Sequence, residues 1–160
     1  MRTTIPLIRA EEWTASGESI PSEADFVPHG SLDEQGAWKQ FGGLSRAEAF
    51  QRFIENPIHY QEDFMWMGPK AFAYYFPVIE RFLFEFELAP DNDDAQAWIL
   101  GCDVMMQFSS TKPDCLKHLV PRIHDLACWV KANVHRFSYD QHEHHRIANK
   151  WARLEELLRG

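Results

Sequence analysis

The hydrophobic residues after residue 44 recur at spacings of three and four, which is the pattern of helices with one buried face. Five segments show this pattern, with start signals at Ser45, Pro69, Asp91, Ser110 or Thr111, and Asp140. At the first start, Ser45 and Glu48 have the spacing of a capping box, in which two side chains satisfy free backbone N–H groups. The links between the segments are short, which favours antiparallel neighbours. The sequence therefore predicts an all-α bundle of about five helices.

One proline lies inside the second predicted helix. Pro77 lacks the backbone N–H that would bond the carbonyl of Ala73. We therefore expect the helix that begins near Pro69 to bend around Pro77.

Residues 1–44 are rich in glycine and proline and show no lasting helical period. We predict an irregular arm over 1–44, with one short strand at Thr4–Ile8 and a short turn of helix near Ser31–Phe41. Aromatic side chains are expected to hold this arm on the helical body over 45–160, namely Trp13, Phe26, Trp38 and Phe41. A chain of 160 residues favours a single domain made of both parts.

The composition excludes several classes of protein. Hydrophobic residues make up 45% of the chain, which is enough for a packed core and argues against disorder. The three cysteines are an odd number in a chain of ordinary size, so a disulfide framework is not expected. No segment reaches the roughly 18 apolar residues of a membrane span, and the N-terminus lacks a signal-peptide pattern. We expect a cytoplasmic protein without membrane association.

The acidic residues are concentrated in the first part of the chain. The net charge is −8, and residues 1–95 carry 17 acidic and 7 basic side chains, whereas residues 96–160 carry 7 and 9. Such a surface repels nucleic-acid phosphates and suits a basic protein partner. The side chains predicted to bind this partner are acids for steering and aromatics for anchoring, namely Glu11, Glu12, Tyr60, Glu62, Asp63 and Trp66.

The sequence predicts no catalytic, metal or cofactor site, although two groups of side chains are candidates for such chemistry. The cluster of His142, Glu143 and His145 supports an alternative reading as a small metal-dependent enzyme, but it lacks a His-Glu-x-x-His motif. Cys128 follows His124 by four residues, so the two can meet on one helix as a nucleophilic pair. The sequence assigns no third group to orient this pair, and a structural cysteine is the favoured interpretation.

Three aromatic-rich stretches lie within residues 38–88: Trp38-Lys-Gln-Phe-Gly-Gly-Leu-Ser45, Asn56-Pro-Ile-His-Tyr60-Gln-Glu-Asp63 and Met67-Gly-Pro-Lys-Ala-Phe72-Ala-Tyr-Tyr75. They resemble a pattern in small, mostly uncharacterised bacterial proteins, some of which resemble immunity proteins of toxin systems. The resemblance implies a bacterial source and a non-enzymatic protein that neutralises a toxin by occlusion. It carries no assigned functional residues. A scaffold subunit of a larger assembly is a third possibility.

Overall fold

The computed structural model describes residues 19–93, 95–109 and 114–159. The N-terminal part of this structure contains α2 (Glu23–Phe26), α3 (Leu32–Phe41), α4 (Arg46–Glu55), α5 (Pro57–Tyr60) and α6 (Asp63–Trp66). The central and C-terminal parts contain α7 (Pro69–Glu85), α8 (Ala97–Phe108), the 3-10 helix η1 (Asp114–Leu119), α9 (Val120–Ala132), the 3-10 helix η2 (Val134–Arg136) and α10 (Gln141–Arg159).

The all-α prediction is confirmed for the described residues, whose only β-type pairing is an isolated bridge between Ala89 and Asn92. The five predicted helices correspond to α4, α7, α8, η1 with α9, and α10. The capping box at Ser45 is present, with the Ser45 hydroxyl accepting from the Glu48 N–H and the Glu48 carboxylate accepting from the Ser45 N–H. The Asp140 carboxylate likewise accepts from the His142 N–H at the start of α10.

The third helix begins six residues later than the start signal at Asp91 indicates. Ala89 and Asn92 exchange two backbone hydrogen bonds of 3.0 and 2.9 Å, which close a turn over the acidic run. Gln96 then adopts a left-handed conformation with φ of 55°, so the helical backbone starts only at Ala97. Asp91 therefore lies in this turn and Asp93 follows it, so neither acid belongs to the first turn of α8.

The count of about five helices was too low, and residues 19–44 are less irregular than predicted. α3 is a helix of 10 residues, because Ser31 and Glu34 form a full capping box and Ala37 and Phe41 give it a buried face. α2 has a second capping box, and α5 and α6 add two single turns between α4 and α7. The predicted strand at Thr4–Ile8 and the predicted anchor Trp13 lie outside the described residues.

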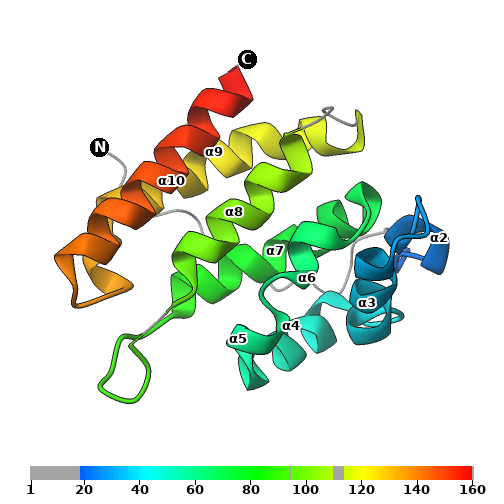
Figure 1. Ribbon diagram of the computed structural model, residues 1–160, viewed down its shortest axis with the longest axis horizontal. Helices are drawn as coiled ribbons and strands as arrows, with labels where there is room; N and C mark the ends of the chain where they lie inside the picture. The colour runs from blue at the N-terminus through cyan, green and yellow to red at the C-terminus, as the bar shows by residue number, and fades with distance from the viewer. Residues whose placement is uncertain (1–18, 94, 110–113, 160) are drawn as a thin grey trace.

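α7 lies between two groups of helices (Figure 1). It packs against α2 and α4 on one side and against α8 and η1 on the other. α10 packs against both α8 and α9, and α6 packs against α3 and α8. The elements from α2 to α6 therefore reach the C-terminal helices through α7 and through the α6–α8 contact.

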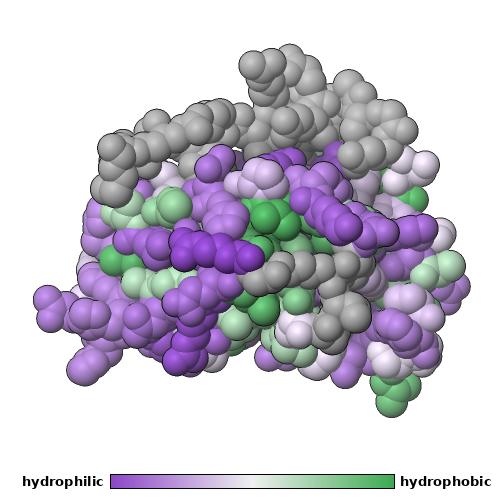
Figure 2. Space-filling view, turned by 90° about the horizontal axis from the view of Figure 1, so that it is seen from above, coloured by the Kyte–Doolittle hydropathy of each residue, from purple (hydrophilic) through white to green (hydrophobic). Residues whose placement is uncertain are grey.

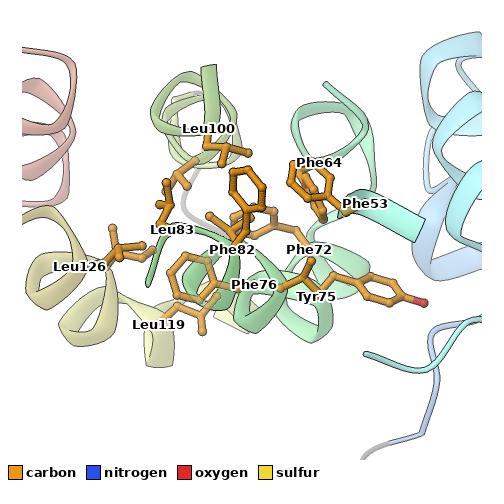
Figure 3. Close-up of a cluster of buried hydrophobic side chains, with 14 of the residues drawn as sticks. Phe53, Phe64, Phe72, Tyr75, Phe76, Phe82, Leu83, Leu100, Leu119 and Leu126 are labelled. Carbon is orange, nitrogen blue, oxygen red and sulfur yellow. The ribbon is translucent and has the colours of Figure 1, made fainter. Parts of the chain in front are cut away.

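Aromatic side chains of α7 fill the centre of the molecule (Figure 3). Phe72, Tyr75 and Phe76 are fully buried in one continuous hydrophobic cluster. The ring centre of Tyr75 lies 5.7 Å from that of Phe26 and 6.3 Å from that of Phe41. Two of the predicted aromatic anchors therefore join residues 19–44 to the helical body. The Tyr75 hydroxyl also donates to the backbone carbonyl of residue 44 at 2.7 Å.

α7 continues as one helix through Pro77. The buried Arg46 of α4 donates from Nε to the carbonyl of Tyr74 at 2.5 Å, next to the Ala73 carbonyl that loses its partner to the proline. Its guanidinium also lies 4.2 Å from the centre of the Tyr74 ring. A charged side chain therefore supplies a hydrogen bond beside the position where the helical ladder is interrupted.

Candidate functional site

Of the predicted partner-binding residues, Tyr60 ends α5, Asp63 and Trp66 lie on α6, and Glu62 directly precedes α6. α5 and α6 are two single-turn helices between α4 and α7. Glu62 and Trp66 are exposed, as a binding role requires. Tyr60 is half-buried, and the centre of its ring lies 5.6 Å from that of the buried Phe41. Phe64 is fully buried and fixes α6 on the core. Glu11 and Glu12, predicted for the same surface, lie outside the described residues.

Three large apolar side chains are exposed close together in the sequence. Ile54 on α4, Ile58 on α5 and Trp66 on α6 have exposed fractions of 42%, 68% and 37%. On the face seen in Figure 2, hydrophilic residues predominate and hydrophobic residues lie in smaller groups between them. We use the name α4–α6 surface for the exposed residues Ile54, Ile58, Glu62 and Trp66, which follow one another in the chain from the end of α4 to the end of α6.

An apolar pocket of about 480 Å³ adjoins the α4–α6 surface between the ends of α4 and α7. Glu85 and Glu87 lie among its lining residues, and Glu85 is paired with Arg81. Most of the remaining lining is hydrophobic and includes Phe50, Ile54, Pro57, Phe82 and Phe86. The pocket therefore has the chemistry to take an apolar side chain that is flanked by positive charge.

Of the two acids predicted to steer a partner, Glu62 is exposed and Asp63 is half-buried. Burial, followed by the neighbouring charge of Glu62, raises the pKa of Asp63 to about 7. Asp103 of α8 is fully buried, and burial followed by the charges of Glu62 and Asp63 raises the pKa of its carboxyl well above the ordinary value. The three acids thus form one coupled group across α6 and α8.

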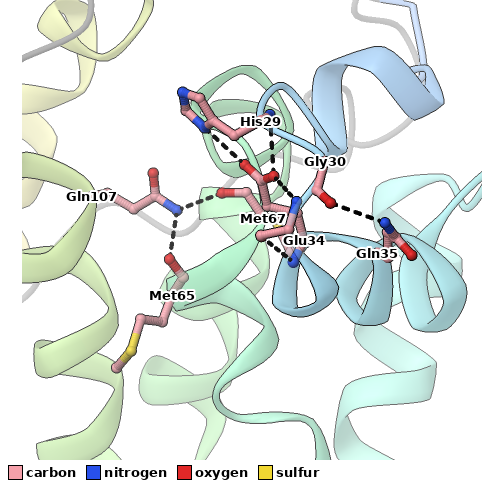
Figure 4. A network of polar contacts seen from close by, with 8 residues as sticks. His29, Gly30, Glu34, Gln35, Met65, Met67 and Gln107 are labelled. Atoms are coloured by element: carbon pink, nitrogen blue, oxygen red, sulfur yellow. Dashed lines mark hydrogen bonds and ion pairs between the residues drawn. The ribbon is translucent and has the colours of Figure 1, made fainter.

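Gln107, one turn after Asp103 in α8, fixes the position of α6 (Figure 4). Its side-chain Nε2 donates to the backbone carbonyls of Phe64, Met65 and Met67, at 2.9, 3.3 and 2.8 Å. Because these bonds satisfy buried carbonyl groups at the end of a four-residue helix, they stabilise a turn that is too short to be stable alone. α8 therefore holds the acids of α6 in place.

Asp103 and Gln107 were missed in the sequence because they lie within the hydrophobic stripe of α8. A signal was available, since Asp103 is the only charged residue between Ala95 and Ser109. A charged side chain in such a run is expected to be either at the edge of the stripe or buried with a special role. Only the packing of α6 on α8 decides between the two.

The structure adds a third group to the pair of Cys128 and His124. Glu155 of α10 accepts from the Cys128 thiol at 3.6 Å, and the same carboxylate oxygen lies 3.8 Å from Nδ1 of His124. Its other oxygen is paired with Lys131. Burial, and after it the negative charge of Glu155, raises the pKa of the Cys128 thiol. Burial and the carboxylate thus disfavour the thiolate, which is the opposite of nucleophile activation.

The histidine cluster at the start of α10 is not assembled as a metal site. His142 and His145 are exposed, and Glu143 is paired with Arg146 at 3.2 Å. His144 is bound instead through its Nε2 to a backbone carbonyl in the preceding loop, at 2.6 Å. Within the part of the chain that the structure describes, no group of three or more His, Cys, Asp and Glu side chains is placed to hold a metal ion together. The metal-dependent enzyme reading thus has no geometric support in these residues.

Comparison with known proteins gives no match among family models, curated proteins or solved structures. The resemblance to immunity proteins therefore stays a prediction. The described helices include none with the length and apolar character that crossing a lipid bilayer requires.

Proposed function

We propose that the chain is a non-enzymatic acidic binding protein, and that it acts as an immunity protein that occludes a basic bacterial toxin. The observation that carries this proposal is the exposure of Ile54, Ile58 and Trp66 on three consecutive helices, beside exposed acids. No lysine or arginine lies between Arg52 and Lys70 in the sequence. The resemblance over residues 38–88 supports the more specific assignment to toxin immunity.

The apolar residues supply the affinity in this proposal. Ile58 is the most exposed of the three, so it has the most surface to bury against a partner. Complete burial of an isoleucine side chain stabilises a complex by about 1.5–3 kcal/mol before entropic costs. The pocket beside Ile54 offers a complementary recess for an apolar side chain of the toxin.

In this proposal, the exposed acids increase the association rate and the selectivity for a basic partner. Glu55, Glu62 and Glu87 are exposed around the α4–α6 surface and the pocket. Exposed charges at the rim of an interface mainly accelerate association with an oppositely charged partner, and added salt screens them. Occlusion needs no chemistry from this chain.

The test uses the product of a neighbouring toxin-like gene, expressed with and without this chain. The chain should restore growth and form a complex that survives size-exclusion chromatography. Ile58→Asp should weaken the complex at least tenfold, because it puts a charge into the apolar contact. Glu62→Lys should slow association several-fold and reduce its dependence on salt.

Glu156→Lys is the matched control for Glu62→Lys, since Glu156 is exposed on α10, away from the α4–α6 surface. It should leave affinity and association rate almost unchanged. A neighbouring product that is harmless alone, or a complex equally tolerant of Ile58→Asp, would contradict the proposal.

A further inference from the structure

The pocket between the ends of α4 and α7 combines aromatic walls with acidic residues. Three phenylalanine side chains line it, those of Phe50, Phe82 and Phe86. Glu85 and Glu87 are its charged lining residues, and the described residues that line it include no basic side chain. Its volume of about 480 Å³ lies within the range of about 300–1,000 Å³ that is typical of binding pockets. The pocket therefore suits an occupant that is apolar along its length and positively charged at one end.

Hydrogen bonds fix the shape of the acidic wall of this pocket. After the end of α7, Ala89 and Asn92 exchange backbone hydrogen bonds, and the Asn92 side chain donates from Nδ2 to the carbonyl of Glu87 at 3.2 Å. The ring of Phe86 packs on that of Phe82, with the two ring centres 5.8 Å apart. Because this wall is already ordered, an occupant binds with a smaller loss of conformational entropy.

The chain holds its own arginine side chains with the same two kinds of group, an aromatic ring and a glutamate. The guanidinium carbon of Arg81 lies 4.3 Å from the ring centre of Phe50, and Arg81 is also paired with Glu85. Phe50 and Glu85 are both lining residues of the pocket. Two further arginines are held in the same way, namely Arg122 by Phe76 and Glu80, and Arg146 by Trp98 and Glu143. A planar guanidinium suits such a site better than an ammonium, because it stacks on rings and bonds carboxylates through two N–H groups.

Glu87 is the acid of the pocket that is available to an outside cation. Glu85 is already paired with Arg81, whereas Glu87 is exposed and forms no ion pair with any described residue. Glu55, which follows the lining residue Ile54 in the chain, is exposed as well. A cation that enters the pocket therefore meets a carboxylate without an internal partner.

We propose that the pocket binds an arginine side chain of the basic partner. The aliphatic stem of this arginine packs against Ile54, Phe82 and Phe86, and its guanidinium pairs with the carboxylate of Glu87. The inference rests on the proposed function for the existence of the partner, and it narrows the side chain that this partner inserts to arginine. Lysine fits less well, because its ammonium is strongly hydrated and does not stack on rings.

The pocket is tested on the full chain without any toxin, by ¹H–¹⁵N NMR titration with Nα-acetyl-L-arginine methylamide. The resonances of the lining residues should shift and reach saturation, with a Kd in the millimolar range. Nα-acetyl-L-citrulline methylamide is the matched probe, because it has nearly the same shape without the charge. It should bind at least about fivefold more weakly, since it loses both the ion pair and the cation–π attraction.

Glu87→Gln should weaken binding of the arginine probe about two- to fivefold and leave binding of the citrulline probe unchanged. Glu156→Gln, at an exposed position of α10, is the control that should bind both probes like the parent. Both substitutions are at exposed positions, so neither should unfold the chain.

The proposal is overturned if the arginine probe shifts no resonance of the pocket, or if the citrulline probe binds equally well. It is also overturned if Glu87→Gln binds the arginine probe like the parent. Each of these results would leave occlusion of a toxin standing, because the titration contains no toxin. A neighbouring product that is harmless alone contradicts the proposed function and does not change the titration, so the two failures are distinguishable.

Discussion

Asp63 has a carboxyl group that gains and loses its proton near neutrality in the folded chain. Its pKa is raised from the ordinary 3.8 to about 7, mainly by burial. Between these two values the folded state holds a proton that the unfolded state has lost, so this group's contribution to stability is present below about pH 4 and is lost as the pH rises to 7. Above pH 7 both states are ionised and the contribution no longer changes.

Asp63→Asn should therefore gain stability relative to the parent as the pH rises. The difference in free energy of unfolding between variant and parent should grow by about 2 kcal/mol from pH 4 to pH 8, after allowance for the partial exposure of the site. Urea unfolding at both pH values measures this difference. Asp125→Asn, at an exposed position of α9, should show no such trend, and parallel curves for Asp63→Asn and the parent would show that Asp63 is ionised throughout.

The residues of the candidate site illustrate which features a sequence reveals. Glu62 and Asp63 stand out in the sequence as an acidic pair beside aromatic residues, and in the structure Glu62 is exposed. Nothing local distinguishes Asp63 from Glu62, because the burial of Asp63 depends on α8, about forty residues away in the chain. The half-buried position of Tyr60 is likewise not visible locally, since it depends on the contact of its ring with Phe41.

At the scale of elements, Gly68 joins α2 to the start of α7. Its N–H donates to the carbonyl of Phe26 at 2.9 Å, and a Cβ atom at this position would lie only 2.1 Å from the backbone oxygen of Asp25. Backbone atoms cannot move away as a flexible side chain does. Gly68→Ala should therefore displace α2 and lower the free energy of unfolding by about 1–3 kcal/mol.

Gly36 provides the matched control for this substitution. It lies inside α3 with no atom within 4 Å of an added Cβ, so Gly36→Ala should raise the free energy of unfolding by about 0.5–1 kcal/mol through better helix propensity. Chemical unfolding of both variants measures the two effects. Equal effects of both substitutions would show that α2 does not pack closely on Gly68.

The elements with two kinds of sequence signal were predicted best. α4 and α10 have both a cap and an apolar stripe, and the structure contains both caps. α3 was underestimated because its apolar stripe is short, although Ser31 and Glu34 carry the same capping signal as Ser45 and Glu48. α6 has almost no signal of its own, since bonds from Gln107 hold it in place.

At the scale of the whole molecule, α7 is the element that both groups of helices share. Leu83 of α7 is fully buried in the cluster that also contains Leu100 of α8 and Leu126 of α9 (Figure 3). The ring centre of Phe82, the preceding residue, lies 4.9 Å from the ring centre of Phe53 of α4. Side chains from both groups of helices therefore meet around the end of α7, and the two groups should unfold together as one cooperative unit.

Leu83→Ala tests this cooperativity and with it the prediction of a single domain. The substitution should lower the free energy of unfolding by about 2–5 kcal/mol, because it opens a cavity in a fully buried cluster. Leu32→Ala makes the same chemical change at a side chain that is 84% exposed, and it should alter stability by no more than about 0.5 kcal/mol. In a cooperative molecule, hydrogen exchange in the centres of α4 and α10 should accelerate by the same factor in Leu83→Ala, since both exchange through global unfolding. Faster exchange in one of these helices with full protection of the other would show two separately folding parts, and the single-domain prediction would then be wrong.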